Sequence, residues 1–228
     1  MKRDPFIPAP GWTQAAFLAR VVSLNDPENR SRVAIKLLSF TDVQDQDTTM
    51  SARVVSAFAG NDRGAFFLPD VDDEVLVMFA QGDRNHPLLV GGLWNGSAPP
   101  PAQIEPGGRN RFKRIRSKNG IVVTLDDQDG KETLQLETPG GQKLTLRDGP
   151  GSVKIEDSNG NRIMLDASGI TVQAPGKVQV TASSVDVTAG MVTVNAAMST
   201  FSGLVKCDVL QTNTVISASY TPGAGNVW

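Results

Sequence analysis

The sequence predicts an all-β protein, with a small N-terminal barrel followed by a C-terminal needle in which three copies of the chain intertwine as a triple-stranded β-helix. Three observations support this fold class. The first half contains short β-rich runs separated by tight turns, and the second half repeats short alternating strands. Aromatic residues make up only 6% of the chain and are concentrated in the first half, so the second half must bury Val, Ile, Leu and Ala. No stretch shows sustained helical periodicity.

The N-terminal part, residues 1–96, contains five β-rich runs. These are residues 16–24, 31–40, 51–59, 74–79 and 88–94. Strong turn sequences separate several of them, including Asn-Asp-Pro-Glu-Asn at 25–29 and Gly-Asn-Asp-Arg-Gly at 60–64. Five short strands with tight turns are typical of a small closed or nearly closed barrel.

A linker follows the barrel at residues 97–111. It is rich in Pro and Gly, and three consecutive prolines (Pro99, Pro100 and Pro101) favour an extended, semi-rigid spacer. We therefore expect three parts: a barrel domain at 1–96, the linker at 97–111, and a needle with a C-terminal tip at 112–228.

The needle segment contains a repeat. Residues 119–126, 140–148 and 159–166 each combine a glycine turn, an alternating strand ending in Leu, and an acidic residue. Shorter strands are expected between them at 133–136 and 153–155. From Gly169 the spacing of the apolar pairs tightens to seven or eight residues, as in Val178/Val180 and Val185/Val187. Such repeats indicate a stacked architecture rather than a globule.

The shortness of these repeats favours a trimer. Each strand offers two or three inward residues, whereas a single-chain solenoid usually needs turns of roughly 20 residues to enclose a core. Three chains wound about one axis can pair their strand edges with one another and leave none open. The segment from Ala167 to Trp228 also has only four charged residues, so its surface is expected to be covered by other copies. The alternatives are a sheet with a flat, aggregation-prone edge or a single-chain β-helix with thin walls.

Residues 67–96 carry a resemblance to a known family. Phe-Leu-Pro-Asp-Val-Asp-Asp-Glu-Val-Leu-Val at 67–77, followed by Gly-Asp-Arg-Asn-His-Pro-Leu-Leu-Val-Gly-Gly-Leu-Trp-Asn-Gly at 82–96, resembles the oligonucleotide/oligosaccharide-binding (OB) fold of phage-tail spike proteins. This family includes baseplate assembly protein V, the lysozyme spikes of contractile phages and the valine-glycine repeat spikes of type VI secretion. The opening strand at 19–27, the Ser-Lys-Asn-Gly at 117–120 and the ending at 220–228 are also similar to it. Asp72 stands where the family often has Gly.

The resemblance implies a homotrimeric central spike at the baseplate of a contractile phage tail or a phage-tail-like injection system. The OB-fold barrel would seat the trimer on a baseplate hub protein, and the needle would meet a membrane only by penetrating it mechanically. The particle would be assembled in the bacterial cytoplasm. The N-terminus lacks the apolar core of a signal peptide, and no apolar run is long enough to span a bilayer. We expect no hub domain before the barrel, and no lysozyme domain fits between Gly96 and Arg109.

The C-terminal tip offers the only candidate partner contacts, Gly223, Asn226 and Trp228. Large aromatics are common anchors at interfaces, and a terminal Trp on a charge-poor needle has little core of its own to enter. Trp228 is therefore expected either to plug the end of the trimer or to dock a separate PAAR-like tip protein.

A basic run at 109–118 raises an alternative: an OB-fold nucleic-acid-binding protein with a β-rich oligomerisation tail. Binding of single strands needs a basic groove with exposed stacking aromatics, and only Phe112 is interleaved here. The competing interpretation is a strand at the neck of the trimer, with its charge offset by nearby acids. Those acids are Asp126, Asp127, Asp129, Glu132 and Glu137. We expect no nucleic-acid partner.

Other chemistry-bearing residues predict structural roles. His86 is the only histidine and Cys207 the only cysteine, so neither a His-based catalytic triad nor a His/Cys metal cluster can form within the chain. His86 is expected in a turn before Pro87, and Cys207 as a small buried thiol. The acidic turn Asp70, Asp72, Asp73 and Glu74 could bind calcium, but it lacks the Gly and distal Glu of a dedicated loop, so a turn-forming role is favoured.

An enzyme is the least favoured class. A β-helical polysaccharide-degrading tail protein needs paired carboxylates in a groove, and the last 62 residues contain only Asp186 and Asp208 as acids. We therefore expect a structural protein without a catalytic residue, cofactor or metal.

Overall fold

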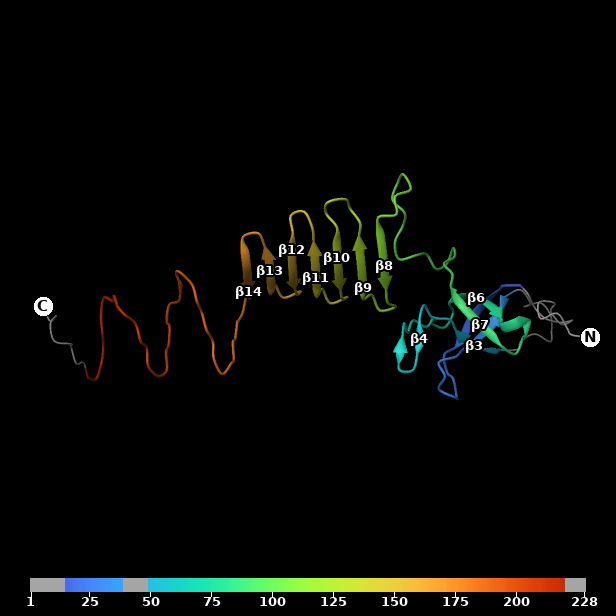
Figure 1. The fold of residues 1–228 in the computed structure, drawn as a ribbon, viewed down its shortest axis with the longest axis horizontal. Coiled ribbons are helices and arrows are strands. Elements are labelled where there is room, and N and C mark those ends of the chain that lie inside the picture. The colour runs from blue at the N-terminus through green and yellow to red at the C-terminus, as the bar shows by residue number, and fades with distance from the viewer. Residues whose placement is uncertain (1–14, 39–48, 220–228) are drawn as a thin grey trace, which may run out of the picture. The chain divides into compact units, whose positions relative to one another are not determined.

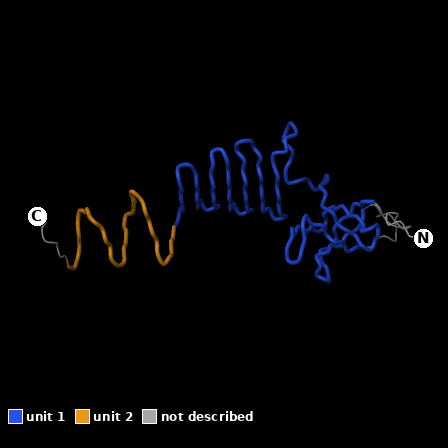
Figure 2. The backbone as a smooth tube through the Cα atoms, in the orientation of Figure 1, with its two compact units in different colours: residues 1–177 blue, residues 178–228 orange. Residues whose placement is uncertain are grey.

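The computed structural model describes residues 15–38 and 49–219, and over these residues it is all-β with only short 3-10 turns such as η2 (Ala80–Gly82) (Figure 1). This confirms the predicted fold class. None of its helical turns is long and apolar enough to cross a membrane. Two compact units divide the chain, residues 1–177 and 178–228 (Figure 2).

The N-terminal strands close into a five-stranded barrel. They are β1 (Phe17–Ser23), β2 (Val33–Leu37), β3 (Met50–Val54), β6 (Glu74–Phe79) and β7 (Pro87–Gly92). Around the barrel their order is β1-β2-β3-β7-β6, and only the β3–β7 pair is parallel. Each strand alternates buried and more exposed residues, as the period of a strand requires. The prediction of five strands and a closed barrel is therefore confirmed.

The barrel has a complete core of its own. Ile35 and Val77 are fully buried, Leu89 is 2% exposed, and the rings of Phe17 and Phe79 meet edge to face at 5.6 Å. These inward-facing residues come from all sides of the barrel, so closure alone buries them. The barrel domain needs no partner to complete its core.

One predicted barrel strand was too long. Residues 51–59 were expected to form a single strand, but β3 ends at Val54, where its pairing with β7 ends. The Ser56 hydroxyl then lies 2.9 Å from the carbonyl oxygen of Phe58 and 2.7 Å from that of Ala65. These contacts turn the chain into a separate hairpin of β4 (Ala59–Gly60) and β5 (Arg63–Gly64), at the sequence expected to be only a turn.

Seven strands follow the linker as one antiparallel sheet in sequence order (Figure 1). They are β8 (Phe112–Arg116), β9 (Val122–Asp126), β10 (Thr133–Glu137), β11 (Lys143–Arg147), β12 (Ser152–Glu156), β13 (Arg162–Asp166) and β14 (Gly169–Gln173). The strands expected as short fillers at 133–136 and 153–155 are as long as their neighbours. The meander is therefore more regular than the repeats alone indicated.

The glycine turns that connect β8 to β9, β10 to β11 and β12 to β13 stack on each other at the ends of the strands. Gly120, Gly141 and Gly160 all have positive φ, between 85° and 92°, and each donates its N–H to the carbonyl three residues earlier. A Cβ on any of them would lie 3.2–3.3 Å from a side chain of the next turn. Those neighbours are Pro139, Ser158 and Pro175. Glycine is thus required twice, by the backbone conformation and by the close approach of the following turn.

Residues 178–219 form extended strips without strand pairing, separated by bends. The bends fall at Ser183, Gly190, Ala197, Gly203, Asp208, Asn213 and Ala218. The expected spacing was seven or eight residues; the bends are seven residues apart from Ser183 to Ala197, but beyond Gly203 they are five residues apart. Val205, Leu210 and Val215 recur with this period of five and are 58–72% exposed. They are more covered than the adjacent apolar residues Leu204, Val209 and Ile216, at 83–97%.

Candidate functional site

One face of the β8–β14 sheet is almost entirely apolar. The strand register aligns two rows of side chains that run across all seven strands on this face. The first row is Ile115, Val123, Leu136, Leu144, Ile155, Ile163 and Val172. The second is Lys113, Leu125, Leu134, Leu146, Val153, Leu165 and Ile170. Lys113, on the edge strand β8, is the only polar member of either row.

This apolar face is uncovered. Leu134 and Leu136 are 38% and 39% exposed, and Ile170 on the edge strand β14 is 72% exposed. Thr124, on the opposite face, is only 9% exposed. Exposure is thus the reverse of what a folded chain arranges for itself, because a sheet with one apolar face needs a second layer against it. The described residues of this chain provide no such layer.

The opposite face carries side chains suited to water. Its central row consists mainly of Thr, Gln, Lys and Arg, and a flanking row places Glu137, Lys143, Glu156 and Arg162 opposite one another on successive strands. The Lys143 ammonium lies 3.6 Å from the Glu137 carboxylate. Alternating charges of this kind favour one strand register and contribute a few tenths of a kcal/mol per pair. The side chains of the polar face are thus suited to contact with water, and the apolar face is the candidate functional surface.

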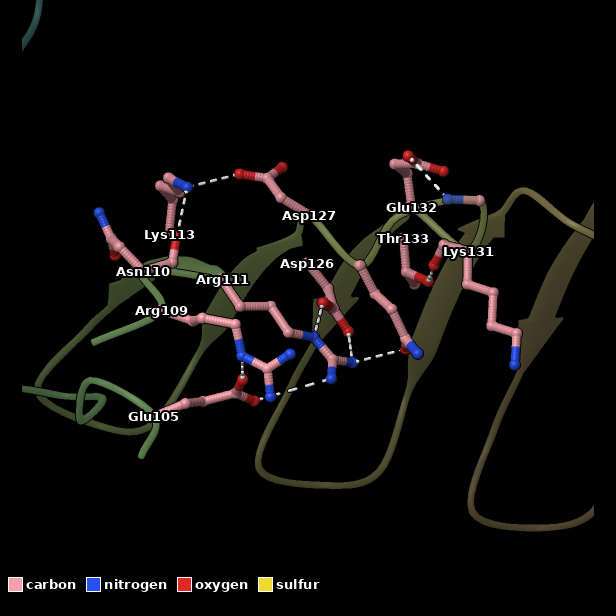
Figure 3. Close-up of polar contacts among 12 residues, drawn as sticks. Glu105, Arg109, Asn110, Arg111, Lys113, Asp126, Asp127, Lys131, Glu132 and Thr133 are labelled. Carbon is pink, nitrogen blue, oxygen red and sulfur yellow. Dashed lines mark hydrogen bonds and ion pairs between the residues drawn. The ribbon is translucent and has the colours of Figure 1, made fainter. Parts of the chain in front are cut away.

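The basic run at 109–118 is largely paired with acidic residues of its own chain (Figure 3). The Arg111 guanidinium contacts both oxygens of Asp126 and lies 2.9 Å from Gln128 Oε1. The hydrogen bond from Arg111 holds the pKa of the Asp126 carboxyl below its ordinary range. Lys113 contacts Asp127, and Arg109 lies 3.8 Å from Glu105. This pairing supports the interpretation of the run as a neck strand.

The acids that offset this charge are only partly those predicted. Asp126 and Asp127 contact the run, but Glu132 accepts a hydrogen bond from the Gly130 N–H, and Glu137 lies beside Lys143. The pairing of Glu105, in the linker, with the basic run was not predicted. It depends on an isolated β-bridge between Glu105 and Arg109, which the residue pattern of the sequence does not reveal. Phe112, the one aromatic of the run, lies beside the Arg111 and Arg114 guanidiniums, 4.9 and 5.7 Å from its ring centre.

His86 and the acidic turn have local structural contacts. The His86 Nδ1 lies 3.0 Å from Asp83, whose pKa is lowered by the backbone N–H of Asn85 and by His86 itself. In the acidic turn, Asp73 accepts a hydrogen bond from the Asp70 N–H at 2.8 Å. Asp72 has a φ of 77°, a backbone conformation that Gly adopts without strain and that Asp tolerates. Among the described residues no three His, Cys, Asp or Glu side chains are grouped to hold a metal ion.

Two further predictions concern the C-terminal region. Cys207 was expected to be buried, and in the single chain it is exposed. Its neighbours Val205 and Val209 are exposed too, since this chain has nothing to cover them. The predicted tip contacts Gly223, Asn226 and Trp228 lie outside the described residues.

The geometry defines a class of protein: a β protein with one barrel that buries its own core and one sheet whose apolar face the described residues leave uncovered. Two family models match the chain at these two parts. Residues 17–94 match the type VI secretion system/phage-baseplate injector OB domain, and residues 133–199 match the phage baseplate V C-terminal trimerisation domain. The chain belongs to the family of phage baseplate V and type VI secretion spike proteins.

Several curated relatives are spike proteins of type VI secretion. The chain is 34% identical over 101 residues to the spike protein VgrG4b of Pseudomonas aeruginosa, covering 43% of this chain and 11% of the relative. It is 23% identical over 111 residues to VgrG1c of the same species, covering 46% of this chain and 15% of the relative. It is also 28% identical over 87 residues to the actin cross-linking toxin VgrG1 of Vibrio cholerae, covering 37% and 8%. The matched region is thus a small fraction of these longer relatives.

Proposed function

We propose that this chain is the homotrimeric central spike of a contractile phage tail or phage-tail-like injection system. The observation that carries the proposal is the uncovered apolar face of β8–β14, because residues 133–199, which include most of that face, match a trimerisation domain. Three copies supply the missing layer to one another.

The energetics favour this arrangement. Fully burying a Leu, Ile or Val side chain contributes about 1.5–3 kcal/mol, and these side chains are already half covered, so each gains roughly 1 kcal/mol on association. This gain in free energy recurs along both rows of apolar side chains, which cross all seven strands, and in each of the three chains. Pairing of the open edges β8 and β14 and of the unpaired strips in 178–219 adds backbone hydrogen bonds between chains.

The proposed role is mechanical. Residues 1–96 form the OB domain that seats the trimer on a baseplate hub protein, residues 97–111 link it to the needle, and residues 112–228 form the intertwined β-helix and its tip. A closely packed aliphatic core with continuous interchain hydrogen bonds resists bending, which is what a needle driven through an envelope by sheath contraction needs. A PAAR-like protein at the tip is part of the proposal. Particle assembly takes place in the bacterial cytoplasm, and the chain itself performs no catalysis.

The test is the mass of the full-length protein in solution. Size-exclusion chromatography with multi-angle light scattering is expected to give three times the chain mass of 24.3 kDa. Negative-stain images of the same fraction should show rods with a wider collar at one end. A clean monomer of 24.3 kDa would refute the trimer and with it the spike.

A further inference from the structure

A second unusual surface lies on the barrel domain, around the β4–β5 hairpin. A hollow there is lined by residues 30–31, 53–60 and 62–68. Three aromatic side chains of this segment are largely exposed: Phe58 at 63%, Phe66 at 73% and Phe67 at 71%. The barrel core is formed by other residues, and these three rings are not part of it. Exposed aromatics gathered at one hollow are typical of a surface that another chain covers.

The hollow is also basic. Arg53 and Arg63 both line it, and neither has an ion pair among the described residues. Arg30, a third lining arginine, lies 3.1 Å from Glu28. Asp62 is the one acid of the lining. An occupant of this hollow should therefore combine an acidic group with an apolar one.

The same chain presents such a group elsewhere on its barrel. The turn at 70–73 carries three aspartates around Val71, which is 44% exposed. Asp73 is used within the turn and Asp70 lies 3.4 Å from Lys118, but Asp72 has no ion pair among the described residues. No described ion pair joins this turn to Arg53 or Arg63 of its own chain.

A closed trimer can bring these two surfaces together between neighbouring copies. In a closed trimer of identical chains every interface is heterologous, so one surface of a copy meets a different surface of the next. We propose that the turn 70–73 of one copy docks in the hollow of the next, with Asp72 at Arg53 and Arg63 and Val71 among the three phenylalanines. The contact rests on the proposed homotrimer and adds a ring of barrel contacts to it.

Cysteine cross-linking of the full-length protein tests the contact. In a Cys207→Ser background, Arg63→Cys is combined with Asp72→Cys and treated with a short bis-maleimide reagent. We expect covalent dimers and trimers on a denaturing gel from the double variant and only monomers from either single variant. The matched control combines Arg63→Cys with Arg84→Cys, since Arg84 lies in the β6–β7 turn and outside both surfaces. Equal cross-linking in the control would overturn the proposal.

The outcomes separate this contact from the proposed function. A trimeric mass without cross-links overturns the barrel contact and leaves the spike proposal intact, which would point to the hub protein as the occupant of the hollow. A monomeric mass overturns both.

Charge reversal gives a second, independent readout. Asp72→Arg should raise amide hydrogen exchange at the hairpin 59–64 severalfold in the intact trimer, because a cation then faces Arg53 and Arg63. Adding Arg63→Asp to that variant should restore protection. Asp72→Asn keeps a residue that tolerates positive φ and removes only the charge, so it should give an intermediate increase. Unchanged exchange in Asp72→Arg contradicts the contact.

Discussion

The barrel and the sheet are made from the same kind of alternating strand but bury it in different ways. In the barrel, β1 pairs with β6 and closes the ring, so that Ile35 and Val77 are fully buried within one chain. In the sheet, β8 and β14 remain edges, and Leu134 and Leu136 stay more than a third exposed. The difference teaches that strand pattern alone does not decide whether a chain folds alone. Closure does, and a sheet that does not close needs a partner.

The largest effect should follow from charging the apolar face. Leu136→Asp with Leu144→Asp places two carboxylates opposite each other on that face, where association would bury them unpaired. We expect light scattering to show monomers in place of trimers. The control variant, Gln135→Asp with Thr145→Asp, places the same charges opposite each other on the polar face of the same strands and should remain trimeric. Trimers from both variants would show that this face is not the interface.

A cavity in the barrel should weaken the barrel and leave the trimer intact. Ile35→Ala removes a fully buried side chain and is expected to destabilise the barrel by about 2–5 kcal/mol. Amide exchange measured by mass spectrometry should quicken in β1, β2 and β3 while β9–β13 stay protected and the trimeric mass is unchanged. Faster exchange in both parts would mean that the two domains unfold together.

The stacked glycine turns should show a smaller effect. Gly141→Ala meets both a positive φ of 85° and a contact of 3.2 Å with Ser158, so we expect a loss of about 1–2 kcal/mol in the free energy of unfolding. Gly130→Ala is the matched control, because its φ is 67° but nothing lies within 4 Å of the added Cβ. Denaturant unfolding should show the larger loss for Gly141→Ala, and equal losses would remove the stacking contribution.

The smallest effect concerns pH and the β1–β2 loop. Asp26 accepts hydrogen bonds from the Arg32 guanidinium and from the N–H groups of Glu28, Arg30 and Arg32, which hold its pKa well below the ordinary value. A lowered pKa stabilises the fold at every pH above the unfolded-state value of about 3.9 and loses that contribution as the pH falls below it. The unfolding temperature of Asp26→Asn should therefore fall less steeply with decreasing pH than that of the wild type below about pH 4. A decline as steep as that of the wild type would contradict this role of Asp26.

The sequence predicted much of the barrel because its strands carry strong local signals. The run 74–79 coincides with β6, and His86 lies in the turn between β6 and β7, before Pro87, as expected. The end of β3 could not be predicted, since it depends on where β7 stops pairing and on the Ser56 hydroxyl, neither of which is local. The hollow lined by Phe58 and Phe66 was not predicted for the same reason. The clustering of three phenylalanines around the turn at 60–64 could have indicated it.

The apolar face was implied by the repeats, but its continuity was not. Most strands of the sheet show only two apolar positions, such as Leu144 and Leu146, and the register that aligns them across seven strands emerges only from the pairing. The shortening to a period of five beyond Gly203 was also missed. Val205, Leu210 and Val215 could have revealed it, but the mixed residues between them hide the repeat.

The stacked turns have a consequence for how such proteins diversify. A Cβ added to Gly120, Gly141 or Gly160 would meet only the turn that follows, so a pair of strands with its glycine turn can be inserted or removed as one unit. Gene duplication or loss of such a unit keeps every remaining turn against an equivalent neighbour and preserves both apolar rows. We expect natural members of this family to vary in length by whole strand pairs, so that reach can evolve without redesign of the barrel.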